Sequence, residues 1–128
     1  MMSFCPDVLK YTDYRKYLAA VLRMAKRKDR KFTVTDFAAC LGLVHRVQVY
    51  LILERKRNLT QTAVMRMTKL CKLKKRSALY LEYLVLWQDT DSEILQNEYF
   101  KRMCRINPRL KSMAKKLNKK RRFARKRK

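Results

Sequence analysis

The chain has 128 residues, of which 48% are hydrophobic, and it carries a formal net charge of +24. One Gly and two Pro accompany many Leu, Lys, Arg, Met and Ala, so a hairpin-rich β-protein is excluded and one all-α domain is expected. The excess of positive charge indicates a polyanionic partner, most simply nucleic acid, with an anionic membrane surface as the alternative.

The first expected element is a helix over residues 12–28, with Thr12 as its N-cap. Apolar residues recur there at three- and four-residue spacing, which places them on one stripe that should face the core. The stripe consists of Tyr14, Tyr17, Leu18, Val21, Leu22 and Ala25.

A second helix should begin at Val34. Thr33 and Asp36 have the spacing of a capping box, in which each side chain bonds the main-chain N–H of the other residue. Phe32 and Phe37 stand at the positions of a hydrophobic staple across the same helix start. The beginning of this helix is therefore strongly specified.

The same helix should end at Gly42, which can adopt the left-handed conformation of a C′ residue. Ala38 is small enough to let two helices cross closely, and the apolar side chain of Leu43 should fill the space inside the turn. A third helix is expected over residues 44–53, with Leu51 facing inward. This spacing is typical of a helix-turn-helix, although a hairpin of helices used only for packing stays an alternative.

Three further helices are expected in segments 60–73, 77–87 and 89–106. Residues 77–87 are apolar on nearly every side, so this helix should be central. Thr90 and Glu93 fit a capping box, Leu95 belongs to the inward stripe of the last helix, and Pro108 ends the pattern. We therefore expect a compact domain of five to six helices over residues 1–107.

Four short motifs follow one another in the chain: YTDYRKYL (11–18), FAACLGL (37–43), KRNLT (56–60) and YLEYLVLW (80–87). In this order they resemble the large Fibrobacter-type paralogous family of transcriptional regulators, over roughly Leu9 to Met103. The resemblance implies a head similar to the Cro/repressor helix-turn-helix, with residues 44–53 as the recognition helix. It also implies that the loop containing Lys56, Arg57 and Asn58 lies near the DNA backbone. The family's usual Gly before KRN is Arg55 in this chain.

The candidate base contacts are His45, Arg46 and Gln48, because they are the polar residues at the start of the expected recognition helix. Arg suits a bidentate contact with guanine, and Gln suits one with adenine. A solvated helix face is the alternative for all three. The sequence therefore predicts that these three side chains contact bases.

Phosphate contacts are expected from two basic segments, because phosphate contacts position a protein without specifying sequence. Their residues are Arg55, Lys56 and Arg57 in the loop, and Lys119, Lys120, Arg121 and Arg122 in the tail. Residues 108–128 form a basic tail, partly helical or disordered, and residues 101–128 hold fifteen Lys or Arg and no acid. Asn58 or Thr60 should cap the helix that follows the loop.

The four cysteines, Cys5, Cys40, Cys71 and Cys104, are far apart, and His45 is the one histidine. Zinc-finger spacing, a Cys–His pair and a Gly-rich phosphate loop are all missing from the sequence. We expect four buried thiols in a reducing compartment, no metal, no cofactor and no enzymatic activity. Residues 1–9 lack a secretory signal, so a cytoplasmic, nucleoid-associated protein is expected.

Two functions remain open at this stage. One is a transcriptional regulator that reads double-stranded DNA through its helix-turn-helix. The other is a packaging protein that binds DNA or RNA without specificity and uses the helix-turn-helix as scaffold. A palindromic operator would require a homodimer, and the sequence has no heptad seam to form one.

Overall fold

A computed structural model of the protein describes residues 5–112. These residues form six α-helices and one 3₁₀-helix without any strand, which confirms the all-α prediction. The elements are η1 (Val8–Lys10), α1 (Tyr14–Lys28), α2 (Val34–Cys40), α3 (Arg46–Leu53), α4 (Gln61–Leu70), α5 (Lys75–Asp89) and α6 (Glu93–Ile106).

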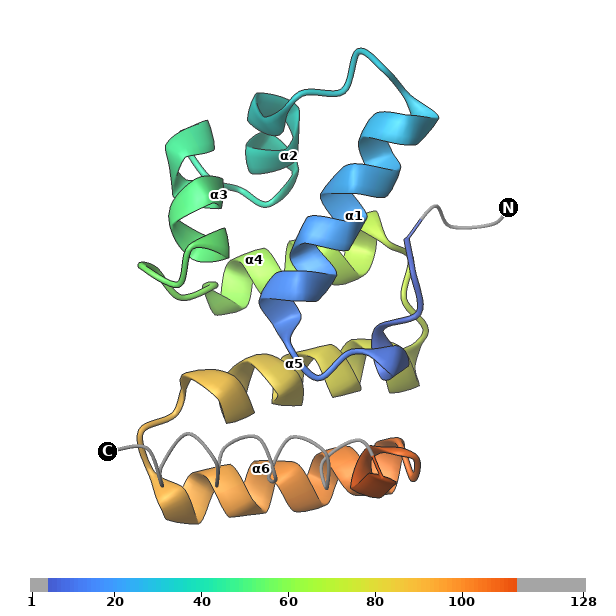
Figure 1. The fold of residues 1–128 in the computed structure, drawn as a ribbon, viewed down its shortest axis with the longest axis vertical. Helices are drawn as coiled ribbons and strands as arrows, with labels where there is room; N and C mark the ends of the chain where they lie inside the picture. The colour runs from blue at the N-terminus through green and yellow to red at the C-terminus, as the bar shows by residue number, and fades with distance from the viewer. Residues whose placement is uncertain (1–4, 113–128) are drawn as a thin grey trace, which may run out of the picture.

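Helix α5 lies in the middle of the molecule, as its apolar sequence predicts (Figure 1). It packs against η1, α1 and α4 on one side, and α6 runs antiparallel along its other side. Helices α2 and α3 pack on each other at the far end of the molecule from α6. α1 contacts both α3 and α5, so it connects the α2–α3 pair to the centre.

A single hydrophobic core joins the elements, and the predicted stripe of α1 is buried in it. Its large aromatic side chains have partners for their polar atoms. The hydroxyl of Tyr17 donates to the carbonyl of Pro6 at 3.1 Å, and that of Tyr80 donates to the carbonyl of Tyr11 at 2.6 Å. Burial raises the pKa of Tyr80 to about 12, so the hydroxyl stays a donor.

Two helices begin at other caps than the sequence suggests. Asp13, rather than Thr12, caps α1, and its carboxylate accepts from the N–H two residues later at 2.9 Å. Ser92, rather than Thr90, caps α6, and its hydroxyl accepts from the N–H three residues later at 3.2 Å. In each case the chain has another good capping residue one or two positions after the predicted one. That residue lies directly before the first helical turn and becomes the cap.

The last helix ends at Ile106 as predicted, but its outer side and the chain that follows it differ from expectation. Leu95 is exposed rather than inward, and Met103 is the residue of α6 that is fully buried. Leu110 is also fully buried, and the Asn107 side-chain amide donates to the carbonyl of Leu9 at 2.6 Å. The core therefore extends past residue 107, where we placed the boundary of the domain.

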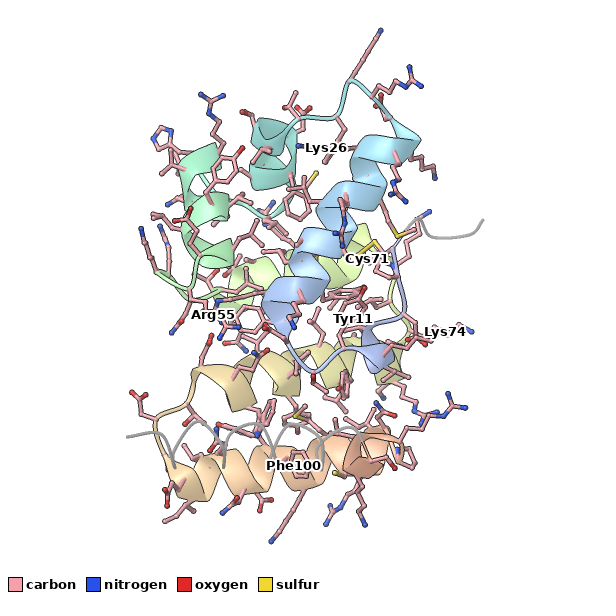
Figure 2. All side chains as sticks on the ribbon, viewed as in Figure 1. Tyr11, Lys26, Arg55, Cys71, Lys74 and Phe100 are labelled. Atoms are coloured by element: carbon pink, nitrogen blue, oxygen red, sulfur yellow. A yellow bond between two sulfur atoms is a disulfide. The ribbon has the colours of Figure 1, made fainter. Side chains whose placement is uncertain are left out.

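The prediction of four thiols is wrong for two of them. Cys5 and Cys71 form a disulfide with their Cα atoms 5.4 Å apart, drawn as a yellow bond in Figure 2. Their separation of 66 residues hides the pairing from any sequence spacing rule. Cys40 and Cys104 are half-buried thiols, and burial raises the pKa of Cys104. None of the helices over residues 5–112 is long and apolar enough to cross a membrane.

Candidate nucleic-acid interface

The start of α2 has the predicted capping box. The N–H of Thr33 donates to Oδ2 of Asp36 at 2.8 Å, and the N–H of Asp36 donates to Oγ1 of Thr33 at 3.1 Å. The rings of Phe32 and Phe37 meet edge to face with centroids 6.4 Å apart. These local contacts hold the loop before α2 against the helix.

The turn after α2 is a Schellman motif centred on Gly42. Gly42 has φ +75°, the left-handed conformation expected of it. Its N–H donates to the carbonyl of Ala39 at 3.1 Å, and the N–H of Leu43 donates to the carbonyl of Ala38 at 2.8 Å. Arg66 of α4 lies over this turn, because a Cβ on Gly42 would be 2.8 Å from the Arg66 Nε.

Helix α3 begins at Arg46, two residues later than predicted, and His45 is its N-cap. Val49 and Ile52 are the buried residues of α3, whereas Leu51 is half-buried. The expectation that Leu51 faces inward is therefore wrong. Only residues three or four apart share a helix face, so the burial of Val49 and Ile52 turns Leu51 to the side.

The outward face of α3 is more apolar than the sequence suggested. Val47 and Tyr50 are 56% and 46% exposed at three-residue spacing on the helix, and Val44, three residues before Val47 and just before the N-cap, is 80% exposed. His45 and Arg46 are exposed beside them. The spacing of 44, 47 and 50 is a visible signal, but it becomes informative only once Val49 and Ile52 are known to face the core.

Gln48, a predicted base contact, caps its own helix. Its Oε1 accepts from the N–H of Val44 at 2.9 Å and from the N–H of His45 at 3.3 Å. A bidentate contact with adenine needs the amide oxygen as an acceptor from the base. Gln48 would therefore have to release the helix start before it could make that contact.

The three basic residues of the loop after α3 differ in their surroundings. Arg55 pairs with Asp13 at 3.0 Å, and Lys56 pairs with Glu54 at 3.5 Å. The Arg57 side chain is exposed and has no acidic partner within residues 5–112. Arg57 is therefore the most available of the three for an external phosphate.

Arg55 also has an unusual main-chain conformation. Its φ is +67°, in the left-handed region that favours Gly. Its N–H donates to the carbonyl of Ile52 at 3.1 Å, and the N–H of Lys56 donates to the carbonyl of Leu51 at 2.9 Å. A Schellman motif therefore ends α3 as well, with Arg55 in the position that Gly usually occupies.

Arg15 at the start of α1 organises the same loop, a role that its position in the sequence does not predict. Its buried guanidinium donates from Nε to the carbonyl of Ile52 at 2.9 Å and from Nη2 to Oδ1 of Asn58 at 3.1 Å. Its Nη1 lies 3.6 Å from Oδ1 of Asp89. Asn58 is thus engaged by Arg15, and Thr60 is the residue that caps α4.

Asp89 completes this buried polar cluster at the end of α5. The hydroxyl of Tyr14 donates to its carboxylate oxygens at 2.9 and 3.1 Å. Burial raises the pKa of Asp89, and the Tyr14 hydroxyl and the Arg15 guanidinium counteract part of that rise. Arg15, Tyr14 and Asp89 therefore join the ends of α1, α3 and α5.

His45 and Arg46 are exposed at the start of α3, and Arg55, labelled in Figure 2, is exposed just after its end. Lys119, Lys120, Arg121 and Arg122 lie outside the described residues, so their predicted phosphate contacts stay predictions. Comparison with protein families, with curated proteins and with solved structures gives no match.

Proposed function

We propose that the protein binds double-stranded DNA through α2 and α3, acting as a helix-turn-helix, and that it regulates transcription. The outward face of α3 is the observation that supports this proposal. It combines the exposed Arg46 with the exposed apolar side chains of Val44, Val47 and Tyr50. No acidic residue occurs from residue 37 to residue 53, so nothing on α2 or α3 past Asp36 repels a phosphate backbone.

The chemistry of this face fits the major groove. An Arg can make a bidentate contact with guanine, and an apolar side chain can contact the methyl group of thymine. Exposed apolar side chains gathered on one helix face commonly mark a binding surface. We therefore assign base reading to Arg46 and Val47 and backbone contact to Arg57, with Tyr50 at the edge of the groove.

One observation favours a packaging protein instead. The amide oxygen of Gln48 is engaged by the main chain of Val44 and His45, which removes one of the three predicted base readers. In that case α3 would lie against DNA or RNA without reading it, and the phosphate contacts would supply the affinity.

The two functions can be separated by mutation after a preferred duplex has been selected from a random pool. Arg46→Ala and Val47→Ala should each relax preference at one base pair, by roughly 1–3 kcal/mol for a bidentate Arg contact. Arg57→Ala should weaken binding to every duplex about equally. Lys101→Ala, on the exposed side of α6, is the control that removes a charge far from α3.

Gln48 needs its own comparison, because it supports the helix. Gln48→Ala should lower the melting temperature through loss of the cap and leave base preference unchanged. A change of base preference at an unchanged melting temperature would make Gln48 a base reader. If Arg46→Ala, Val47→Ala and Arg57→Ala lose affinity in parallel for all duplexes and for RNA, the regulator is excluded in favour of the packaging protein.

A further inference from the structure

A second concentration of positive charge lies away from α3, around the start of α5 and the end of α6. We call it the basic pole. Figure 2 labels Lys74 of the pole and Arg55 after α3 on opposite sides of the molecule. All its members are exposed: Lys10, Lys72, Lys74, Lys75, Arg76, Arg105, Arg109 and Lys111.

Segments far apart in the chain build this pole together. Lys10, Arg76 and Arg109 line one hollow of about 700 Å³. Arg76 joins α5 to α6, since its guanidinium donates from Nε to the carbonyl of Ile106 at 2.7 Å and also from Nη2. Asp7 is the acidic residue of the hollow, and its carboxylate already accepts from the N–H of Leu9 at 3.0 Å.

Several positively charged residues of the pole occupy positions where a cation or a side chain destabilises the local structure. Lys74, Lys75 and Arg76 gather at the amino end of α5, where the helix dipole repels cations. Lys74 is the N-cap and its side chain makes no capping hydrogen bond, and the first turn has no acid. Lys72 has φ +51°, a left-handed conformation in which Gly would be unstrained.

A bound polyanion would relieve the repulsion between these side chains. Departures from local preference that all add charge to one surface are expected where that surface has a function. The very basic residues 113–128 also follow Lys111 and Ser112 in sequence. The pole and the outward face of α3 belong to different elements, and α3 and the amino end of α5 lie on opposite sides of the molecule in Figure 1.

We propose that the basic pole is a second, sequence-independent surface for the phosphate backbone of duplex DNA. With one duplex at α3 and another at the pole, a single chain bridges two duplex segments. The bridging rests on the proposed function of α3, whereas backbone binding by the pole does not.

The test uses the full chain, one duplex immobilised on beads and a second, fluorescent duplex in solution. The pole variant carries Lys72→Gln, Lys74→Gln and Lys75→Gln, and it spares Arg76 because of the bond to Ile106. The pole variant should capture at least about tenfold less of the second duplex than wild type does, because it loses phosphate contacts. Each lost contact should also reduce the slope of log affinity against log salt by about 0.9. The variant should still bind one duplex with the base preference of the wild type.

A matched control removes the same charge elsewhere, through Lys16→Gln, Arg23→Gln and Arg27→Gln, which are all exposed on α1. The control should capture the second duplex like the wild type. The control variant should melt at the wild-type temperature, because its substituted side chains are exposed and make no hydrogen bond within residues 5–112. The pole variant should melt at the wild-type temperature or slightly above it, because it removes cations from the amino end of α5.

Several outcomes would overturn the proposal. If the pole variant still captures the second duplex, other residues bridge the two duplexes. If the control variant loses capture to the same extent, the net charge of the protein explains the capture and the pole does not. A change of oligomeric state in the pole variant would assign bridging to a dimer. Loss of binding to phosphatidylserine vesicles with duplex capture intact would assign the pole to a lipid surface. If α3 does not read bases, Arg46→Ala should leave base preference unchanged. The salt dependence of binding would still become shallower in the pole variant, so this result can be told apart from a pole that does not bind DNA.

Discussion

The guanidinium of Arg15 donates to the carbonyl of Ile52 at 2.9 Å, which ties the start of α1 to the last turn of α3. The same side chain reaches Asn58, so it holds both ends of the basic loop that contains Arg55 and Arg57. Helix α3 has eight residues and is too short to be stable alone. Its position therefore depends on a buried cation from another helix.

Arg15→Met should lower the free energy of unfolding by about 3–5 kcal/mol, because it leaves Asp89 and the carbonyl of Ile52 without their buried partner. Arg15→Lys should rescue little, since an ammonium group lacks the planar fork that reaches several acceptors at once. Urea unfolding at neutral pH measures both. Lys16→Met, an exposed neighbour, is the control. A wild-type midpoint for Arg15→Lys would show that charge alone suffices.

Stability should depend on pH through Asp89, whose pKa is raised by burial. The native state keeps this proton to higher pH than the unfolded chain does, so the stabilising contribution is present at low pH. It is lost as the pH rises through the raised pKa. The free energy of unfolding of wild type, relative to Asp89→Asn, should therefore fall as the pH increases from the ordinary carboxyl range. Denaturant unfolding over a pH series measures this difference, and a constant difference would contradict the role of Asp89.

The left-handed residues that end α2, α3 and α4 predict opposite mutational effects. Gly42→Ala should destabilise by about 1–2 kcal/mol, because a side chain is strained at φ +75° and would displace Arg66. Lys72→Gly should stabilise by up to about 1 kcal/mol, since it relieves strain at φ +51°. Arg55→Gly should gain less, because it also loses the ion pair with Asp13. Thermal unfolding ranks the three variants, and a loss of stability in Lys72→Gly would argue against strain there.

The Cys5–Cys71 disulfide should be detectable by counting thiols. Denatured, unreduced protein should react with two equivalents of thiol reagent, from Cys40 and Cys104. Cys5→Ser should lower the free energy of unfolding by about 2–4 kcal/mol, because the bond closes a long loop in the unfolded chain. Cys40→Ser is the control without a disulfide. Four reactive thiols in the oxidised protein would contradict the bond.

Two truncations should separate the tail from the folded body. Deleting residues 111–128 should preserve helicity and melting temperature while making the salt slope of DNA binding shallower by about 0.9 for each phosphate released. Deleting residues 108–128 also removes the buried Leu110 and should lower the melting temperature. Circular dichroism and binding titrations at matched salt test both truncations. An unchanged salt slope after the first deletion would mean that the tail does not touch DNA.

Some of the fold could be predicted because its causes are local. The capping box of Thr33 and Asp36 and the left-handed turn at Gly42 involve residues within a few positions of one another. The buried stripe of α1 follows from helical spacing alone. Such features depend on the order of residues and not on what packs against them.

The rest of the site depends on contacts that sequence spacing does not encode. In the sequence, Arg15 looks like the many exposed basic residues of the chain. Its hydrogen-bond acceptors are 37 and 43 residues away. Gln48 has the side chain of a base reader, and the same amide suits a helix cap three residues from His45. Val47 and Tyr50 look like core residues until the burial of Val49 fixes the phase of α3. In each case the residue type was informative and its neighbours decided its role.

The cluster at Arg15 also joins parts of the chain that are synthesised at different times. The cluster needs Asp89 at the end of α5, and the main-chain N–H of Tyr14 beside it bonds Gln88 across 74 residues of sequence. Because a chain is synthesised from its amino terminus, Arg15 and Ile52 are made before Asp89, which holds the Arg15 guanidinium. We therefore expect a chain interrupted before residue 89 to hold the last turn of α3 less firmly than the complete chain does.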